Sequence, residues 1–376
     1  MNNLFDSKKI SNLREILKDK NRIFLVTGKK SFKKSGAKAL LSEYLKDKEV
    51  MRFSDFKTNP EMEDLKSGIE IFKSFKPEIV IAVGGGSVID IAKLINIFSF
   101  QKFTPEKIIN DKKNIKKEGL KLIAIPSTTG TGSEVTQFSV VYKDKKKYSV
   151  DHEYLTPTDF IIEPKLALSL PSYEMSCSAF DALSQATESF WSVNSSEESK
   201  SYSKKAIKLL IKSINPAIIS RNLGDIKNLF LGANLAGRAI NLTRTTAPHA
   251  FSYPLTSRFG IPHGHAVAVL LGKFFEVNSN PLPENIVDQR GKKYLDEMSR
   301  ELFDLFECKT SQECEKYWYD LMKKLSLETN LKKLGINDMK DIHTIFNNVN
   351  FERLKNNPTL VTEDKFSDIL LSLQLH

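Results

Sequence analysis

The stretch IVIAVGGGSVID, residues 79–90, decides the fold class of this chain. A run of apolar residues without alternation is typical of a strand buried on both faces of a parallel sheet. It ends in three glycines, which let the backbone approach a phosphate, and the start of the following helix offers unpaired N–H groups. A glycine turn that binds nothing is the alternative, but three glycines exceed what a helix cap requires. We therefore predict that Gly84, Gly85, Gly86 and Ser87 bind a pyrophosphate.

Similar apolar runs lie on both sides of this stretch, at residues 23–27, 122–125 and 160–162. A helical pattern at 35–48 follows the first run, and a small antiparallel pair is expected at 137–142 and 148–152. Strands that alternate with helices predict a parallel sheet covered on both faces. After Pro171 helical periodicity dominates. We predict an α/β dinucleotide-binding domain over residues 1–168 and an all-helical metal- and substrate-binding domain over residues 169–376.

The composition bounds the class of protein. Of the 376 residues 40% are hydrophobic, and this content excludes a mainly disordered chain. The formal net charge is +10. No apolar run approaches the length of a membrane span, and three scattered cysteines predict a reducing, cytoplasmic location rather than a disulfide framework. The excess lysines fall in short runs without interleaved aromatic residues. Solvated surfaces explain them better than nucleic-acid binding, and the net charge also favours an anionic small molecule.

A second polar segment, PSTTGTGSE at residues 126–134, follows the strand at 122–125. Taken alone it could be an ordinary hydroxyl-rich loop. Ligands of parallel sheets bind at the carboxyl ends of the strands, however, and two such loops end consecutive strands. We expect the segment to line a groove for the phosphate, ribose or nicotinamide of a cofactor, through the side chains of Ser127, Thr128, Thr129 and Thr131.

The helical part contains a possible metal site. Asp181 and Gln185 are spaced i,i+4 and project from one face of a helix. His249 and His263 lie downstream. A carboxylate with two imidazoles is a common ligand set for Fe(II) or Zn(II) with open coordination positions. Histidines that are satisfied in a helical core are an equally good reading of these residues alone.

Together the segments 84–93, 125–136, 180–188 and 249–264 resemble the iron-containing (group III) alcohol dehydrogenase family, over about residues 20 to 275. The resemblance implies the dehydroquinate synthase-like fold, NAD(P)-linked oxidoreductase activity and a metal in the helical domain. It implies Asp181, His249 and His263 as metal ligands. It also implies cofactor contacts by the glycine turn with Asp90, by the hydroxyl-rich loop, and by Lys147, for which a surface lysine is the alternative.

Three positions depart from the family pattern. Gln185 stands where a metal-binding histidine is usual, which leaves the metal and the role of the amide open. Tyr253 replaces another histidine near the substrate, and with His263 it is predicted to act in catalysis. Gly28 stands at the end of the first strand, where many NAD-using members carry an aspartate. The loss of that charge, with Lys29 and Lys30 beside it, predicts a preference for NADPH over NADH.

Residues 184–192 and 243–256 are similar to the phosphonoacetaldehyde reductase branch of the family. This similarity implies reduction of phosphonoacetaldehyde to 2-hydroxyethylphosphonate, by direct hydride transfer, with Tyr253 as a possible proton donor. Arg244 and Arg258 flank His249, and a guanidinium suits a phosphonate, so both are predicted to bind the substrate. Ordinary salt bridges are the alternative for each arginine.

Several other functions stay open from the sequence. The chain could reduce another small aldehyde, such as a semialdehyde. It could catalyse a cyclisation of the dehydroquinate synthase type, which needs a different ligand set, or it could be a nucleotide-binding protein that has lost its metal through Gln185. A homodimer is the default expectation for the oligomeric state.

Overall fold

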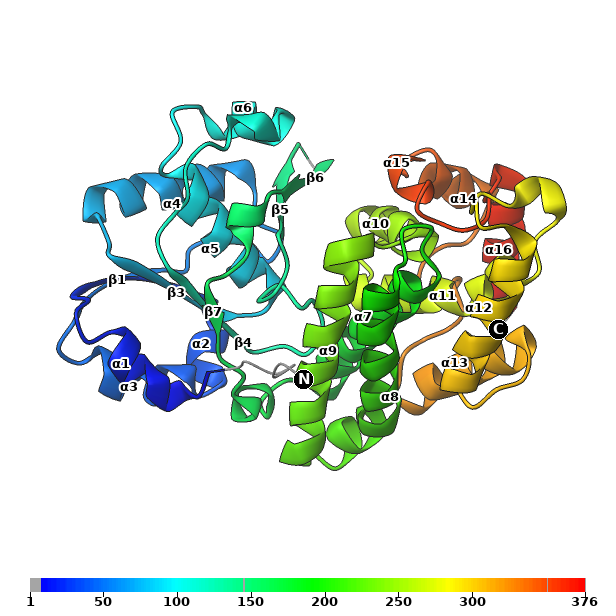
Figure 1. Ribbon diagram of the computed structural model, residues 1–376, viewed down its shortest axis with the longest axis horizontal. Helices are drawn as coiled ribbons and strands as arrows, with labels where there is room; N and C mark the ends of the chain where they lie inside the picture. Colours follow the sequence, from blue (N-terminus) through cyan, green and yellow to red (C-terminus); the bar gives the residue numbers. More distant parts are fainter. Residues whose placement is uncertain (1–7, 145, 350, 376) are drawn as a thin grey trace. The chain divides into compact units, whose positions relative to one another are not determined.

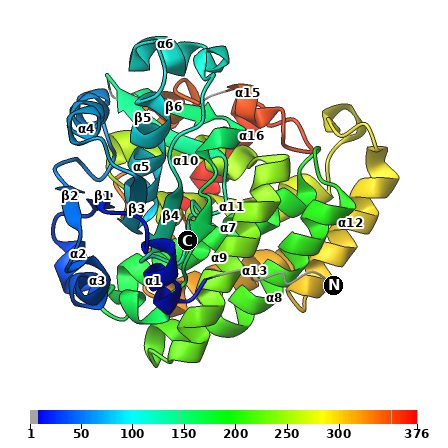
Figure 2. The ribbon, with the colours of Figure 1, turned by 60° about the vertical axis from the view of Figure 1, so that its left-hand side comes forward.

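The computed structural model describes residues 8–144, 146–349 and 351–375. Its backbone contacts divide the chain into two compact units, Met1–Leu170 and Pro171–His376. The first unit holds a parallel sheet with helices, and the described part of the second is built from helices (Figures 1 and 2). The predicted fold class, an α/β unit followed by a helical one, is confirmed.

The first unit is organised around a five-stranded parallel sheet. Its strand order is β2-β1-β3-β4-β7, and each neighbouring pair is parallel. The strands are β1 (Arg22–Thr27), β2 (Glu49–Phe53), β3 (Ile79–Gly84), β4 (Leu122–Pro126) and β7 (Asp159–Phe160). Because β2 and β3 lie on opposite sides of β1, the strand order reverses beside β1. Ligands of open α/β sheets bind at such a reversal, beyond the carboxyl ends of the strands.

Alternate residues of the strands point to opposite faces of the sheet and contribute to two separate hydrophobic cores. Phe24 and Val26 pack on the face covered by α4 (Met62–Phe75) and α5 (Gly86–Phe98). Ile23 and Leu25 pack on the opposite face, against α1 (Leu13–Ile16) and α3 (Ala37–Leu45). Figure 1 shows the two helical layers on either side of the sheet. The continuous apolar runs in the sequence arise because both faces are covered.

Two details differ from the sequence-based expectation. Strand β2 was not predicted, because only Phe53 of its residues is buried and its pattern is therefore not apolar. The helix expected at 35–48 is present as the shorter α3, and a separate short helix, α2 (Ser31–Lys34), precedes it because Gly36, with a φ of 82°, interrupts the helical backbone. The predicted antiparallel pair is present as β5 (Phe138–Lys143) and β6 (Lys146–Asp151), and α6 (Pro105–Asn110) lies between β3 and β4 in sequence.

The second unit is centred on α7, which packs against α8, α9 and α11. Phe180 on α7 and Trp318 on α13 are buried in its core, with their rings 5.2 Å apart. The helices are α7 (Ser172–Trp191), α8 (Glu197–Ile219), α9 (Leu223–Thr243), α10 (Ala247–Phe259), α11 (His263–Ser279), α12 (Gly291–Leu305), α13 (Ser311–Lys324), α14 (Met339–Phe346), α15 (Phe351–Leu354) and α16 (Glu363–Leu373). Within the described ranges, no helix combines the length and apolarity that a bilayer span requires.

Candidate metal centre and nucleotide-binding edge

The predicted cofactor residues of the first unit meet at one edge of the sheet. The register pairs Thr27 of β1 with Val83 of β3, and Gly84 of β3 with Pro126 of β4. The segments that follow these strands therefore begin side by side. The edge includes the point where the strand order reverses, which is the expected position for a dinucleotide.

The glycines let the two loops after β3 and β4 touch. A Cβ atom on Gly85 would lie 3.2 Å from the Thr128 side chain, and one on Gly86 would lie 2.7 Å from Thr131 Cγ2. Gly85 and Gly86 also form the N-terminus of α5, whose first N–H groups have no partner within the helix. The hydroxyl-rich loop is thus held directly beside an anion-binding helix end.

The hydroxyl-rich loop also holds an unsatisfied polar atom. The backbone N–H of Ser127 donates to Gly84 O at 2.9 Å, which joins this loop to the glycine turn. Thr129 is fully buried, and its Oγ1 has no hydrogen-bond partner in the described structure. A buried hydroxyl without a partner is costly, so this position fits a bound ligand with polar groups. The residues present therefore fit a dinucleotide.

The carboxylate of Asp90 forms a structural hydrogen bond within the protein. Its Oδ2 accepts a hydrogen bond from Val140 N at 3.0 Å, which fastens α5 to β5. Burial raises the pKa of Asp90, and the charges of Lys93 and Lys147 oppose that rise. Lys147, which is half-buried on β6, therefore lies within electrostatic reach of the helix that begins at the glycine turn. The cofactor contacts predicted for both residues stay predictions.

Gly28 follows β1 at the same edge and lies beside a cation. Arg52 on β2 donates from Nε to Thr27 Oγ1 at 2.8 Å and from Nη2 to Gly28 O at 3.1 Å. Its guanidinium also lies over the Phe32 ring, and no carboxylate in the described ranges pairs with it. Lys29, in contrast, is paired with Asp55 at 2.9 Å. The positive charge expected next to Gly28 is therefore supplied by Arg52 more than by Lys29.

The second unit brings three predicted metal ligands together. One ligand atom each from Asp181, His249 and His263 lies within 4.8 Å of the others. His249 Nε2 is 3.3 Å from Asp181 Oδ1, and His263 Nε2 is 3.9 Å from the same oxygen. Atoms bound to one metal at about 2.0–2.2 Å are separated by similar distances. The carboxylate and the two imidazoles thus form a donor set that fits Fe(II) or Zn(II).

Neighbouring groups hold both imidazoles with Nε2 toward this cluster. His249 Nδ1 donates to the fully buried carboxylate of Glu188, which also accepts from Thr246 N and Thr246 Oγ1. Ser252 Oγ donates to His249 O at 2.8 Å, so it accepts from Nδ1 of His263 at 3.4 Å. When a cation is bound, each Nδ1 can keep its proton, and each Nε2, once deprotonated, presents a lone pair to the ion.

The electrostatics of the cluster favour a bound cation. Burial alone would lower the pKa of His249, but Glu188 and Asp181 outweigh it and raise the pKa to about 10. Burial would raise the pKa of Asp181, yet the hydrogen bond from His249 and the charge of His263 lower it. Two buried carboxylates therefore require positive charge at this position, which a divalent ion can provide.

Gln185 lies on the same helix face as Asp181, and its side chain helps to lower the pKa of that carboxyl. Its Oε1 is buried and has no hydrogen-bond partner in the described structure. An amide oxygen in this state can accept from a metal-bound water or ligate the ion directly. Its role in the metal site stays a prediction, and the buried oxygen supports it.

Gly264 lets the helix that carries His263 approach α7. A Cβ atom at this position would lie 1.9 Å from Cys177 O and 3.1 Å from Asp181 Cβ. Only glycine permits this approach without a shift of the backbone. The short distance between His263 and Asp181 therefore depends on a missing side chain next to the ligand.

Tyr253 lies against His263, the most exposed residue of the cluster. Its ring stacks on the His263 ring at a centroid distance of 5.6 Å and an angle of 13°. Its Oη accepts a hydrogen bond from Arg353 Nη1 at 3.0 Å. Arg258 is exposed and donates to Asn348 Oδ1 at 2.6 Å, and Arg244 ends α9 with a φ of 66°. The substrate contacts predicted for these two arginines stay predictions.

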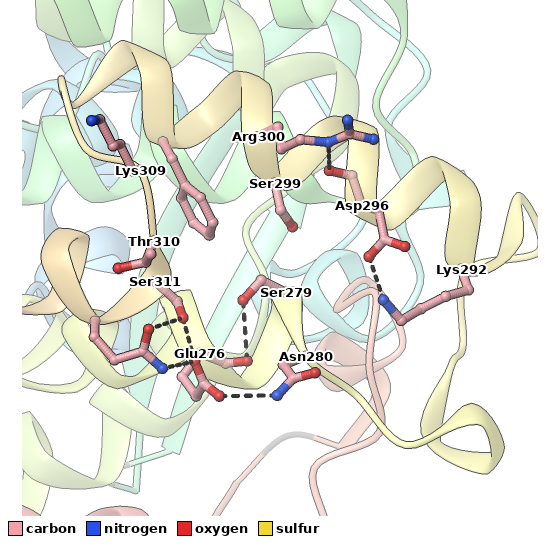
Figure 3. Close-up of a pocket in the computed structure, with 12 residues that line it drawn as sticks. Glu276, Ser279, Asn280, Lys292, Asp296, Ser299, Arg300, Lys309, Thr310 and Ser311 are labelled. Carbon is pink, nitrogen blue, oxygen red and sulfur yellow. Dashed lines mark hydrogen bonds and ion pairs between the residues drawn. The ribbon is translucent and has the colours of Figure 1, made fainter.

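Two other features of the second unit lie outside the cluster. His265 is buried with both nitrogens hydrogen-bonded, to Tyr173 Oη and Glu328 O, which is the arrangement of a structural histidine. A polar pocket of about 550 Å³ lies beside α12 and the start of α13, and Figure 3 shows the side chains that line it. Arg300 is among its lining residues, and none of the predicted site residues is.

Sequence reasoning did not identify Glu188, Arg52 or Arg353. Glu188 could have been found, because it follows Asp181 by seven residues and Gln185 by three and so lies on the same helix face. Arg52 is on an unpredicted strand, and Arg353 is a hundred residues from the tyrosine that it contacts. No local pattern marks either arginine.

Comparisons with known proteins cover nearly the whole chain. The model of the iron-containing alcohol dehydrogenase family matches residues 2–164, and that of the C-terminal region of the Fe-containing alcohol dehydrogenase family matches residues 176–373. The structure of sulfoacetaldehyde reductase from Bifidobacterium kashiwanohense, in complex with NAD+, is 28% identical, with a TM-score of 0.87 over 98% of this chain and 96% of that chain.

Two curated relatives match over part of their length. Long-chain-alcohol dehydrogenase 1 of Geobacillus thermodenitrificans is 34% identical over 58% of this chain and 56% of its own length. Phosphonoacetaldehyde reductase of Streptomyces viridochromogenes is 28% identical over 58% of each. The chain thus spans little more than half the length of these relatives.

Proposed function

Because the chain belongs to the iron-containing alcohol dehydrogenase family, we propose that it is a metal-dependent, NAD(P)H-linked aldehyde reductase. The observation that carries this proposal is the cluster of Asp181, His249 and His263, in which both imidazoles present Nε2. The same cluster favours a reductase over a metal-free nucleotide-binding protein. When bound, the reduced nicotinamide supplies a hydride and the divalent ion polarises the aldehyde carbonyl.

The residues of the chain hold and orient the reactants. Glu188 and Ser252 fix the two histidines in the tautomers that a metal requires. Tyr253 Oη accepts from Arg353, so its own proton can be donated to the carbonyl oxygen of a substrate. The glycine turn and the loop at 126–134 bind the cofactor through backbone N–H groups and hydroxyls.

The proposed substrate is a small aldehyde with an anionic group, phosphonoacetaldehyde in the first place, reduced to 2-hydroxyethylphosphonate. Two relatives are named for the reduction of such compounds, phosphonoacetaldehyde and sulfoacetaldehyde. The formal net charge of +10 favours an anionic substrate. A semialdehyde, whose anionic group is a carboxylate, is the second candidate.

The proposed cofactor is NADPH rather than NADH. Gly28 removes the carboxylate that would repel a 2′-phosphate, and Arg52 provides a guanidinium at the same edge without a carboxylate partner among the described residues. We also propose a homodimer in a reducing, cytoplasmic environment, consistent with three buried free cysteines.

The test is a screen of NADPH and NADH oxidation with phosphonoacetaldehyde, succinic semialdehyde and propanal. Protein loaded with Fe(II) or Zn(II) should oxidise NADPH with phosphonoacetaldehyde, and chelator should abolish this activity. Equal turnover in the presence of chelator would refute the metal dependence.

A further inference from the structure

Arg353 contacts Tyr253, which in turn packs against the metal cluster. It belongs to the short helix α15, and its Nη1 donates to Tyr253 Oη at 3.0 Å. Its guanidinium carbon lies 5.3 Å from the centroid of the same ring. The ring therefore contacts the guanidinium both at its hydroxyl and across its face, which fixes the position of the charge.

The same tyrosine stacks on His263, the ligand on the accessible side of the cluster. The side chain of His263 is 33% exposed, compared with 4% for His249 and 6% for Asp181. A substrate carbonyl must therefore approach from the side of His263. The guanidinium carbon lies 5.3 Å from the Tyr253 ring centroid and the imidazole centroid lies 5.6 Å from it, so both groups border the same tyrosine side chain.

The charge of Arg353 is not neutralised by the described residues. None of their carboxylates forms an ion pair with its guanidinium, and its neighbour Glu352 is paired with Lys355. Arg290 in the same unit, in contrast, is paired with Asp288. Arg353 is half-buried and uses one N–H on a neutral phenol, so the remaining donors suit an oxyanion.

We infer that Arg353 binds the phosphonate group of the aldehyde substrate, and that Tyr253 spans the distance between this group and the carbonyl. This inference rests on the proposed function, and in it Arg353 is the residue that selects the substrate of the reductase. A planar fork of N–H donors matches the oxygens of a phosphonate, and a sulfonate shares this tetrahedral arrangement. An uncharged aldehyde has no anionic group for these donors to bind.

The binding test uses calorimetric titration of methylphosphonate into the metal-loaded protein. Arg353→Gln should weaken this binding roughly 10- to 100-fold, and Arg353→Lys should restore part of it. Arg300→Gln is the control, because Arg300 also has no carboxylate partner in the described part of the chain, and this variant should bind methylphosphonate as the wild type does. Equal binding by wild type and Arg353→Gln would overturn the inference.

The kinetic test separates this inference from the proposed function. Arg353→Gln should raise KM for phosphonoacetaldehyde and sulfoacetaldehyde by a similar factor, and it should lower kcat/KM for both at least about ten-fold more than for propanal. An equal loss for all three aldehydes would overturn the role of Arg353 and leave the reductase intact. A wild type that binds methylphosphonate through Arg353 but reduces no aldehyde would refute the proposed function and retain the anion site.

Discussion

The nucleotide-binding edge and the metal cluster are built in opposite ways. At the edge, each contributing segment directly follows its own strand, and backbone N–H groups with small side chains form the surface. In the cluster, Asp181 on α7 meets histidines from α10 and α11, and His249 is 68 residues away in sequence. The edge depends on small or absent side chains that expose the backbone, whereas the cluster depends on three specific side chains.

The largest effect is expected at the cluster. His263→Ala removes one of three ligands, so the protein should lose its metal and its reductase activity should fall on the order of 10³-fold or more. Metal content by mass spectrometry and NADPH oxidation measure the two effects. His343→Ala, at an exposed histidine paired with Glu363, is the control and should retain both. Full activity of His263→Ala in the presence of chelator would refute the metal mechanism.

Gly264→Ala tests whether the cluster also depends on a missing side chain. Its Cβ would collide with Cys177 O, so we expect a loss of about 1–3 kcal/mol in the free energy of unfolding and weaker metal binding. Gly224→Ala is the matched control. It is also the second residue of its helix, and its Cβ would come no closer than 3.1 Å to Asn222 Oδ1. Unchanged metal affinity in Gly264→Ala would show that the approach of α11 to α7 does not position His263.

Glu188→Gln should weaken metal binding by roughly 10- to 100-fold without removing a ligand. The Glu188 carboxylate accepts hydrogen bonds from a backbone N–H, a hydroxyl and His249. The amide N–H group of a glutamine would face one of these donors and lose that bond. Competition with a chromogenic chelator measures the affinity. Glu174→Gln, on the exposed side of the same helix, should have no effect. A Glu188 variant with wild-type affinity would reduce Glu188 to a packing role.

The contrast also explains what the sequence could predict. The strand and turn signals at residues 79–87 and 122–132 lie within a few positions of each other, so the apolar strands and the polar edge follow from local pattern, whereas the exposed strand β2 does not. The metal ligands Asp181, His249 and His263 were predicted through a family resemblance, because spacing alone left core histidines as an equal alternative. Arg52 and Arg353 could not be found, since each acts through a tertiary contact that no periodicity records.

Gly28→Asp tests the cofactor preference at the edge. An aspartate there should repel a 2′-phosphate and bond the ribose hydroxyls of NADH, which shifts the ratio of kcat/KM for the two cofactors by about ten-fold or more toward NADH. A Cβ at this position would lie 2.1 Å from Ser31 Oγ, so the change is made together with Ser31→Ala, and Ser31→Ala alone is the control. A wild type that already prefers NADH would contradict the argument.

The smallest effect is expected for Gln185→His. An imidazole is a better metal donor than an amide oxygen, so metal affinity should rise by less than about ten-fold if residue 185 reaches the ion. Metal competition titrations give the change. An affinity equal to that of the wild type would place Gln185 outside the coordination sphere.

The central claim is that the chain is a metal-dependent reductase of an anionic aldehyde. Its most direct test is kcat/KM for NADPH-dependent reduction of phosphonoacetaldehyde and of propanal, measured with the metal-loaded protein and again after chelation. We predict that phosphonoacetaldehyde is the better substrate by at least about ten-fold and that chelation abolishes both activities. Equal efficiency with the two aldehydes, or activity that survives chelation, would contradict the account.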